Sequence, residues 1–433
     1  MRSRRASQRL SLTAGIARVM TAYVLLPLMM RALVAVAVTV VGACSPAAPP
    51  EQYGFVALLG RDTISVERVA RQGNWLTIDG VDRFPRVRQR HTRLELGDDG
   101  GIKHLTMDIH TPSEPANQQD RQVVVDVTSD SVRIVKRDQA GTLRRAFAAG
   151  GRTAIAHVPQ MYSLYEVYFM AALRKAAGVP PGPADTVRLT QFYIDREFDQ
   201  YRLHSGVVKV LPAGKAEIVH DWLAGIGDAE LDSAGRLLEY SGARTTYKVA
   251  ASRVEDPPDV QAIGARLAAE ESARGGVRQL SVRDTARASI GSATFAVDYG
   301  RPLARGRTLL GGILPYDQLW RTGANAATQF TTSVPITLGG LAVPAGTYTL
   351  WTIPRVNGAD LIVNKQTGNW GTSYDAAQDL GRTTMTADSV ATPVETFTIA
   401  VQATDDRRGA LTMEWGSFRW KAPILVHTAR PSS

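Results

Sequence analysis

The chain has almost no cysteine and none of the common catalytic motifs. Cys44 is the only cysteine among 433 residues, which excludes an internal disulfide, a thiolate metal cluster and a CxxC redox pair. The sequence contains no GxSxG nucleophile elbow, HExxH zinc motif, GxxxxGK[ST] phosphate loop or GxGxxG turn after a predicted strand. No two of the seven histidines have the i, i+4 spacing of a helical metal site. We therefore expect no cofactor and no metal ion. The sequence contains no motif that identifies a reaction.

The chain has no strong excess of positive charge beyond its leader. Its formal net charge is +9. Six positive charges lie before Cys44, in a segment without acidic residues: Arg2, Arg4, Arg5, Arg9, Arg18 and Arg31. About +3 therefore remains on the rest of the chain. We expect no nucleic-acid partner, because nucleic-acid binding depends on a dense basic surface.

The leader has the pattern of a secretory signal rather than of a membrane span. Twelve uncharged, mostly apolar residues at positions 32–43 follow Arg31 and end at Cys44, whereas a spanning helix needs about 20 apolar residues. The tetrapeptide Val41-Gly42-Ala43-Cys44 resembles the lipobox of bacterial lipoproteins. The resemblance implies a lipid anchor on Cys44, and Ser45 after it implies sorting to the outer membrane, with the protein facing the periplasm. The alternative is an ordinary signal followed by an unmodified cysteine.

Composition and turn residues divide the chain into five expected segments. These are a lipoprotein signal peptide (1–43), a Pro-rich tether (44–52), a curved antiparallel β domain (53–256), a helical linker (257–290) and a β-sandwich domain (291–427). Strand-like runs separated by Gly- and Asp-rich turns fill both domains, which predicts a mainly β protein. We expect the first sheet to curve strongly, as a half-barrel.

Two stretches have helical rather than strand periodicity. Within 161–177, Met161, Tyr165 and Phe169 recur at four-residue steps, which predicts one helix packed on the curved sheet or plugging it. Core packing explains these apolar and aromatic side chains, and the alternative is a cavity for a hydrophobic ligand. The stretch 259–274 predicts the linker helix.

The second domain is predicted from short alternating runs between 292 and 425. Among them are 329–334, 348–353 and 396–403, with hairpin turns at Gly339-Gly340 and Pro344-Ala345-Gly346. Several short strands with regular turns are typical of a compact β-sandwich. A polar stretch, 281–290, leads into it.

The segment 299–325 crowds Arg, Gly, Pro, Trp and Asn together, and it carries a family resemblance. The matching motifs are Tyr299-Gly300-Arg301-Pro302, Trp320-Arg321-Thr322-Gly323-Ala324-Asn325, Pro344-Ala345-Gly346-Thr347-Tyr348, Asn364-Lys365, Trp370-Gly371 and Asp379-Leu380-Gly381-Arg382. In this order they resemble the bacterial domain-of-unknown-function family numbered 2911, over about a third of the chain. Ala326 departs from the family, which usually has an acid there. The resemblance implies a fold and a set of residues but no activity.

Six residues of these motifs are candidates for binding a ligand: Arg301, Trp320, Arg321, Asn325, Asn364 and Trp370. Arginine offers a planar fork of donors for a carboxylate or phosphate, tryptophan offers an apolar wall, and asparagine both donates and accepts. A small anionic ligand would suit this set. The structural alternative is that the arginines bond loop carbonyls and stack on Trp320, which would fix a long connection between strands.

Three charged patterns occur in the first domain: Arg86, Arg88 and Arg90 on one strand face, Asp195, Glu197 and Asp199 on another, and His104, Asp108 and His110 on a third. The arginines would attract lipid phosphate, the acids would serve acid–base chemistry, and the histidine face would allow a metal site. Solvent-facing residues paired with opposite charges on neighbouring strands are the simpler interpretation of all three.

We therefore expect a membrane-anchored periplasmic lipoprotein that is not an enzyme and that binds a small anionic or hydrophobic ligand or serves envelope maintenance. The alternative is an exported hydrolase or sugar-modifying enzyme that uses Arg321, Asn325 and an acid such as Asp379. A scaffold that binds another envelope protein through an exposed strand edge is a third hypothesis.

Overall fold

The computed structural model describes residues 49–427 except 84, 152, 178–184, 195–202, 220–223 and 275–279. The signal peptide, Cys44 with its predicted lipidation, most of the tether and the acidic stripe at 195–199 lie outside the described residues. No helix among the described residues is both long and apolar enough to cross a membrane. The chain from Ala48 to Ser433 forms one compact unit.

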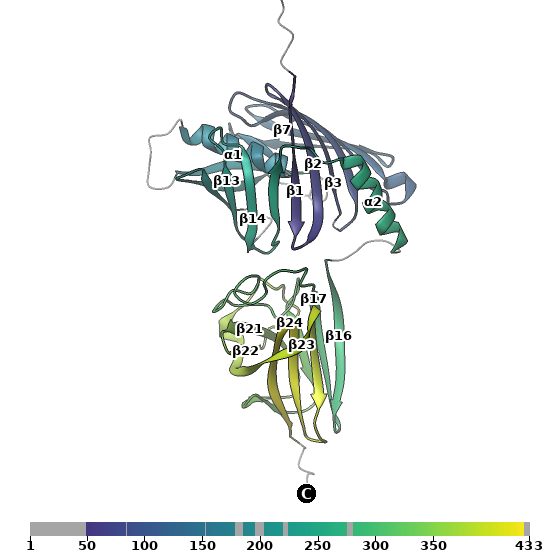
Figure 1. The fold of residues 1–433 in the computed structure, drawn as a ribbon, viewed down its shortest axis with the longest axis vertical. Helices are drawn as coiled ribbons and strands as arrows, with labels where there is room; N and C mark the ends of the chain where they lie inside the picture. The colour runs from purple at the N-terminus through teal and green to yellow at the C-terminus, as the bar shows by residue number, and fades with distance from the viewer. Residues whose placement is uncertain are drawn as a thin grey trace, which may run out of the picture. The chain divides into compact units, whose positions relative to one another are not determined.

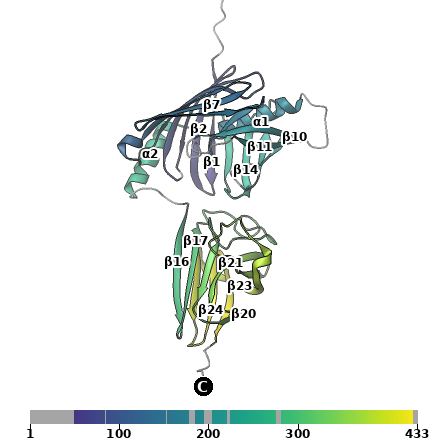
Figure 2. The same cartoon turned by 180° about the vertical axis from the view of Figure 1, so that it is seen from behind.

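Fifteen strands form the first sheet, in the order β8-β7-β6-β5-β4-β3-β2-β1-β15-β14-β13-β12-β11-β10-β9. Their bounds are β1 Glu51–Leu59, β2 Asp62–Gln72, β3 Trp75–Asp82, β4 Arg88–Leu96, β5 Ile102–His110, β6 Asp120–Val127, β7 Ser131–Asp138, β8 Gly141–Ala148, β9 Ala154–His157, β10 Asp185–Tyr193, β11 His204–Leu211, β12 Lys215–Val219, β13 Gly225–Leu231, β14 Leu237–Thr245 and β15 Ala250–Val254. Neighbours are antiparallel except β9 and β10. The sheet curves without closing into a barrel, and β8 and β9 are its edges (Figures 1 and 2).

Helix α1, Tyr162–Ala177, packs inside the curve of this sheet. It contacts β1, β2, β9, β10, β11 and β14. Tyr165 and Phe169 are buried in the main core with sheet residues such as Tyr53, Leu94 and Val123. The predicted helix and its packing are confirmed. The apolar face of α1 packs against the apolar inner face of the strands.

Helix α2, Val260–Ala273, covers the other face of β2 and β3. Asp259 caps it, since its carboxylate accepts a hydrogen bond from the Ala262 N–H at 3.0 Å. Val81 belongs to the cluster under α2, whereas Ile78 belongs to the main core. Residues an odd number of positions apart on a strand point to opposite faces, so α1 and α2 lie on opposite faces of the sheet.

Nine strands form the second sheet, in the order β16-β17-β18-β21-β22-β23-β24-β19-β20. Their bounds are β16 Ser281–Ile290, β17 Ala293–Pro302, β18 Thr328–Thr332, β19 Ile336–Leu338, β20 Leu341–Val343, β21 Gly346–Arg355, β22 Gly358–Asn364, β23 Asp379–Ala403 and β24 Arg408–Val426. Strands β16 and β17 contact β23, so the sheet folds over its own core (Figure 1). That core includes Phe330, Phe397, Trp415 and Trp420.

Two strands are longer or begin earlier than the sequence predicts. β23 spans 25 residues and pairs first with β22 and then with β24, with register shifts between Ser389 and Thr398. Only its end, 396–403, was predicted, because its first half is largely exposed and polar. β16 forms where a polar lead-in was predicted. It is an edge strand with little burial, and such strands carry no alternating apolar pattern.

Candidate functional site

The loop 303–327 joins β17 to β18 and is held in an unusual backbone conformation. Arg305, Asp317, Thr322 and Asn325 have positive φ angles of 54°, 62°, 54° and 63°. Non-glycine residues rarely adopt the left-handed region, and for a β-branched residue such as Thr322 the conformation is strained. Such a backbone persists where surrounding contacts hold it, and it is more frequent at functional sites than elsewhere.

Trp320 anchors this loop to the second sheet. Its Nε1 donates to the Gly323 carbonyl at 3.1 Å. Its ring stacks on Trp415, with centroids 6.1 Å apart and an interplanar angle of 13°. The backbones of Trp320 and Thr352 exchange hydrogen bonds of 2.7 and 2.9 Å. The Trp320 indole therefore has a structural role, which is to hold the loop against the second sheet.

The exchange between Trp320 and Thr352 lays the loop antiparallel against β21. Side chains alternate along such a pair, so the neighbours of the bridged residues share the face opposite to Trp320. On that face Arg321 lies across from Trp351, and Leu319 lies across from Ile353. The geometry thus brings a cation and three apolar side chains together.

Arg321 has no side-chain partner among the described residues. Its Nε is buried without a hydrogen bond, and no carboxylate pairs with its guanidinium. The side chain is half-buried, and burial lowers its pKa from the ordinary value for arginine. A buried guanidinium normally acquires a counter-charge, so this one is chemically incomplete.

Trp351 and Tyr374 form an apolar wall beside Arg321. Trp351 is only 2% exposed, yet its Nε1 has no hydrogen-bond partner in the described part of the chain. It packs with Ala327 and Ile362 in a small cluster separate from the main core, with Tyr374 alongside. The Trp351 and Tyr374 rings meet edge to face at 5.1 Å. An indole N–H without an acceptor is a second unsatisfied donor at this place.

Arg307 is a second arginine without a carboxylate partner among the described residues. It donates to the carbonyls of Ala304 and Leu303 at 3.0 and 2.7 Å. Burial, and then the neighbouring charge of Arg305, lowers its pKa to about 10. Arg307 and Arg321 both line one hollow, which Trp351, Gly371 and Tyr374 also line. We call this the Arg321 hollow.

Gly371 makes room for Arg321. A Cβ at this position would lie 2.0 Å from the Arg321 Cδ and 2.3 Å from the Asn325 carbonyl oxygen. We expect Gly371→Ala to displace Arg321 and lower the free energy of unfolding by about 1–3 kcal/mol, as overpacking does, which urea unfolding would measure. Gly80→Ala is the matched control, because its Cβ would meet only ordinary contacts at 3.5 and 3.7 Å. Equal losses for the two variants would contradict this role of Gly371.

The other predicted arginine, Arg301, lies outside the Arg321 hollow. Its Nη1 donates to the Asp284 carboxylate at 2.8 Å, and its Nη2 donates to the Thr398 hydroxyl at 3.2 Å. Asp284 stands on β16, so an intact ion pair across the sheet neutralises Arg301. Arg301 therefore ties strands together, with partners other than the loop carbonyls and Trp320 of the structural alternative.

Asn364 is also used by the fold. It is fully buried, donates through Nδ2 to the Asp375 carbonyl at 2.8 Å and to the Asp379 carboxylate at 2.9 Å, and accepts from the Gln366 N–H at 2.9 Å. Asp379 additionally accepts from the Tyr374 hydroxyl at 2.8 Å. These groups fix the segment after β22 and leave no free polar atom for a ligand.

Asn325 and Trp370 are exposed at the rim. The Asn325 carbonyl accepts from the Gly371 N–H at 3.1 Å, and Trp370 is 56% exposed beside Ala326. Of the six predicted residues, Trp320, Arg321 and Asn325 line the Arg321 hollow, whereas Arg301, Asn364 and Trp370 do not. Arg307 was not among the six predicted ligand-binding residues, and its bonds to loop carbonyls match the structural alternative. No sequence pattern indicated the unsatisfied Trp351 N–H.

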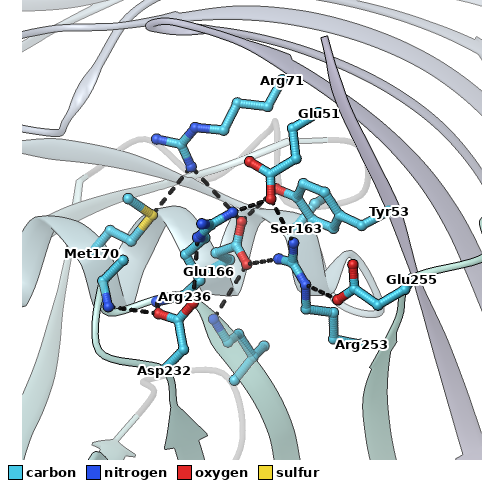
Figure 3. A network of polar contacts seen from close by, with 12 residues as sticks. Glu51, Tyr53, Arg71, Ser163, Glu166, Met170, Asp232, Arg236, Arg253 and Glu255 are labelled. Carbon is cyan, nitrogen blue, oxygen red and sulfur yellow. Dashed lines mark hydrogen bonds and ion pairs between the residues drawn. The ribbon is translucent and has the colours of Figure 1, made fainter. Parts of the chain in front are cut away.

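A polar network lies inside the first sheet, around Glu166 of α1 (Figure 3). Its carboxylate accepts from the Tyr53 hydroxyl at 2.5 Å, from Arg253 Nη1 at 3.1 Å and from the Leu237 N–H at 3.2 Å. Arg71 Nη1 lies 3.9 Å away. Burial raises the pKa of Glu166, although these donors oppose the rise. The groups around the Glu166 carboxylate are all protein donors of this network. We therefore assign the network to the stability of the fold.

Glu67 caps the N-terminus of α1 from strand β2, which the helix contacts. Its buried carboxylate accepts hydrogen bonds from the Tyr162 N–H and from the N–H and hydroxyl of Ser163. The exposed N–H groups of a helix start favour a negative charge. Burial nevertheless dominates and raises the pKa of Glu67 to about 7.

The histidine face carries separate His–Asp pairs rather than a metal centre. Three pairs each have an Nδ1 to carboxylate distance of 2.7 Å: His91 with Asp79, His104 with Asp126, and His110 with Asp120. Asp108 instead accepts from Gln122 at 2.9 Å. No group of three metal-ligating side chains occurs within the described ranges.

The predicted arginine stripe is paired and partly buried. Arg88 donates to the Asp82 carboxylate at 2.9 Å, Arg90 pairs with the same carboxylate, and Arg86 pairs with Glu114. Arg90 is only 4% exposed. The arginines are therefore paired with acids, as the simpler interpretation expected, but not on a solvated face.

No curated protein matches the chain. A crystal structure of a DUF1089 family protein from Pseudomonas aeruginosa is 14% identical, with a TM-score of 0.31, over 43% of this chain and 93% of that one. A beta-barrel-like protein of domain of unknown function DUF1849 from Brucella abortus is 12% identical, with a TM-score of 0.30, over 49% of this chain and 98% of that one. Scores this low assign no function.

The second sheet has a family match. The model described as "Protein of unknown function (DUF2911)" matches residues 281–424, which include β16, the loop 303–327 and nearly all of β24. The resemblance carried by the Trp320–Asn325 and Pro344–Tyr348 motifs is thereby confirmed, and the C-terminal third of this chain resembles the DUF2911 family.

Proposed function

We propose that this protein is an exported, membrane-anchored protein of the bacterial cell envelope that binds a small anionic ligand through its C-terminal β-sandwich, without catalysing a reaction. The half-buried guanidinium of Arg321, which has no partner among the described residues, carries the proposal. Removing a cation from water without a counter-charge costs free energy. A carboxylate or phosphate would supply both the charge and the acceptors.

The second arginine strengthens the same proposal. Among the described residues Arg307 has only backbone carbonyls as hydrogen-bond acceptors, so Arg307 and Arg321 both bring a positive charge without a carboxylate partner to the Arg321 hollow. Together with the Trp351 N–H, they form a donor set for an anion rather than for a neutral sugar or a cation.

The location follows from the sequence of the leader. The lipobox ending at Cys44 and the Ser45 that follows support a lipid anchor in the outer membrane, with the rest of the chain in the periplasm. The Pro-rich tether before β1 would be extended and would hold the first sheet off the membrane.

Binding is favoured over hydrolysis or sugar modification because the acid that catalysis would need is occupied. Asp379 accepts hydrogen bonds from Asn364, Tyr374 and Arg382, and it is not among the residues that line the Arg321 hollow. Arg321 and Asn325 alone provide neither a nucleophile nor a general base.

We expect Arg321→Gln to weaken anion binding by about 10- to 150-fold, the equivalent of one hydrogen bond to a charged group. The glutamine keeps a polar side chain of similar length but removes the charge. Isothermal titration calorimetry of the Ala48–Ser433 unit with phosphate, acetate and succinate would measure the change.

Arg419→Gln is the matched control. Arg419 is neutralised by Glu414 at 2.5 Å on β24 of the same sheet and does not line the hollow, so its loss should leave binding unchanged. If the unaltered protein binds none of the three anions, or if both variants lose affinity equally, the proposed site is wrong.

A further inference from the structure

The Arg321 hollow has an apolar side next to its cationic side. Its lining also includes Ile313, Pro315, Leu319 and Pro354. Leu319 is 40% exposed, although it is a large hydrophobic side chain. Apolar side chains beside an uncompensated guanidinium do not suit a fully hydrated inorganic anion, which would leave them in water.

The backbone pairing sets the order of these groups. Because Trp320 bridges Thr352, the pair Arg321 and Trp351 is followed along the strands by the pair Leu319 and Ile353. The Asp317 N–H donates to the Pro354 carbonyl at 3.0 Å, which is one residue out of the register set by Trp320 and Thr352, so the pairing becomes irregular before Leu319. One two-residue step covers about 6.6 Å along a strand. The cationic end and the apolar end therefore lie side by side at that distance.

The apolar end is separate from the main core. Trp351, Ala327 and Ile362 form their own cluster, and Ile353 and Tyr374 pack against it only in part. The cluster itself is buried, and Leu319 with Ile313 and Pro315 of the lining presents the apolar strip beside the charge that a flexible hydrocarbon group could cover. Each methylene buried there would contribute the free energy of leaving water.

We propose that the ligand is an anionic amphiphile, with its carboxylate or phosphate on Arg321 and its hydrocarbon part along Leu319 and Ile313. The inference rests on the proposed function, because it assigns the anion site its ligand class. The head accepts from the guanidinium and from the N–H of Trp351, and the chain covers the apolar strip. No covalent step is involved.

The test is a chain-length series on the Ala48–Ser433 unit. Acetate, butanoate, hexanoate and octanoate, and separately methyl, butyl, hexyl and octyl phosphate, would be titrated by calorimetry below their micelle-forming concentrations. Affinity should rise by about three- to fourfold for each methylene that is buried, and should level off once the strip is covered. The two series separate a preference for carboxylates from one for phosphates.

Two variants test the anionic head group and the hydrocarbon part of the ligand separately. Leu319→Ser should flatten the dependence on chain length, and Arg321→Gln should weaken the whole series. Val356→Ser is the control, because Val356 is 77% exposed and does not line the hollow. It should keep the slope of the unaltered protein.

Two results would overturn the inference, and they differ from the failure of the proposed function. If anions bind with the same affinity at every chain length, or if Leu319→Ser keeps the full slope, the ligand is a simple anion and the amphiphile is excluded. If no member of either series binds, the anion site itself is wrong.

Discussion

Glu166→Ala is expected to lower the free energy of unfolding by about 3–5 kcal/mol, the cost of breaking a buried ion pair. The Glu166 side chain is fully buried between Arg253 and Arg71, whose side chains are only 6% and 13% exposed (Figure 3). Without the carboxylate, two guanidinium groups and the Tyr53 hydroxyl lose a common acceptor. Urea unfolding of the Ala48–Ser433 unit, followed by far-ultraviolet circular dichroism, would measure the loss.

Glu255 offers a matched control on the same arginine. Its carboxylate accepts from Arg253 Nε at 3.1 Å, but its side chain is 81% exposed. Exposed ion pairs contribute about 0–1 kcal/mol, so Glu255→Ala should change little. A loss of similar size for both variants would show that burial does not set the strength of the Glu166 network.

Glu67→Gln is expected to remove a pH dependence of stability. The pKa of Glu67 is about 7 in the folded protein and 4.5 as the reference value. A raised folded pKa means that the stabilising contribution is complete below about pH 4.5 and is lost as the pH rises through 7. At 1.36 kcal/mol for each pKa unit, the unaltered protein should lose about 3 kcal/mol relative to Glu67→Gln between pH 4.5 and 8. Urea unfolding at several pH values would show the two curves diverging.

Ser163→Ala tests the cause of the pKa within the same site. The Ser163 hydroxyl donates to Glu67 and lowers its pKa against the effect of burial. Its removal should raise the Glu67 pKa further and move the loss of stability to a higher pH. Parallel stability curves for the unaltered protein and Glu67→Gln would exclude Glu67 as the titrating group.

The sequence predicted those features that depend on local periodicity. Tyr165 and Phe169 recur at helical spacing, and α1 forms there; Asp259 precedes an apolar helical pattern, and it caps α2. The alternation of apolar residues likewise predicted two β regions. Local patterns are sufficient for such elements, because one face of each is buried against a single core.

The pairing state of charged residues could not be predicted. Arg301 and Arg321 look equivalent in the sequence, yet Arg301 meets Asp284 on an edge strand that has no periodic signal, and Arg321 meets no acid among the described residues. Glu67 and Glu166 are likewise unremarkable on a strand and a helix. Their burial is set by contacts between segments 95 and 71 residues apart, which no local pattern reports.

The place of β1 in the first sheet has a consequence for the rate of folding. β1 pairs with β15, so Gly54 lies opposite Val254. One side of the first strand therefore stays unpaired until the last strand of the sheet has been made. Closing a loop of this length costs conformational entropy before β1 and β15 form any stabilising contact. A high contact order therefore slows folding. We expect slow refolding, and a partly formed sheet whose open edge can pair with other chains.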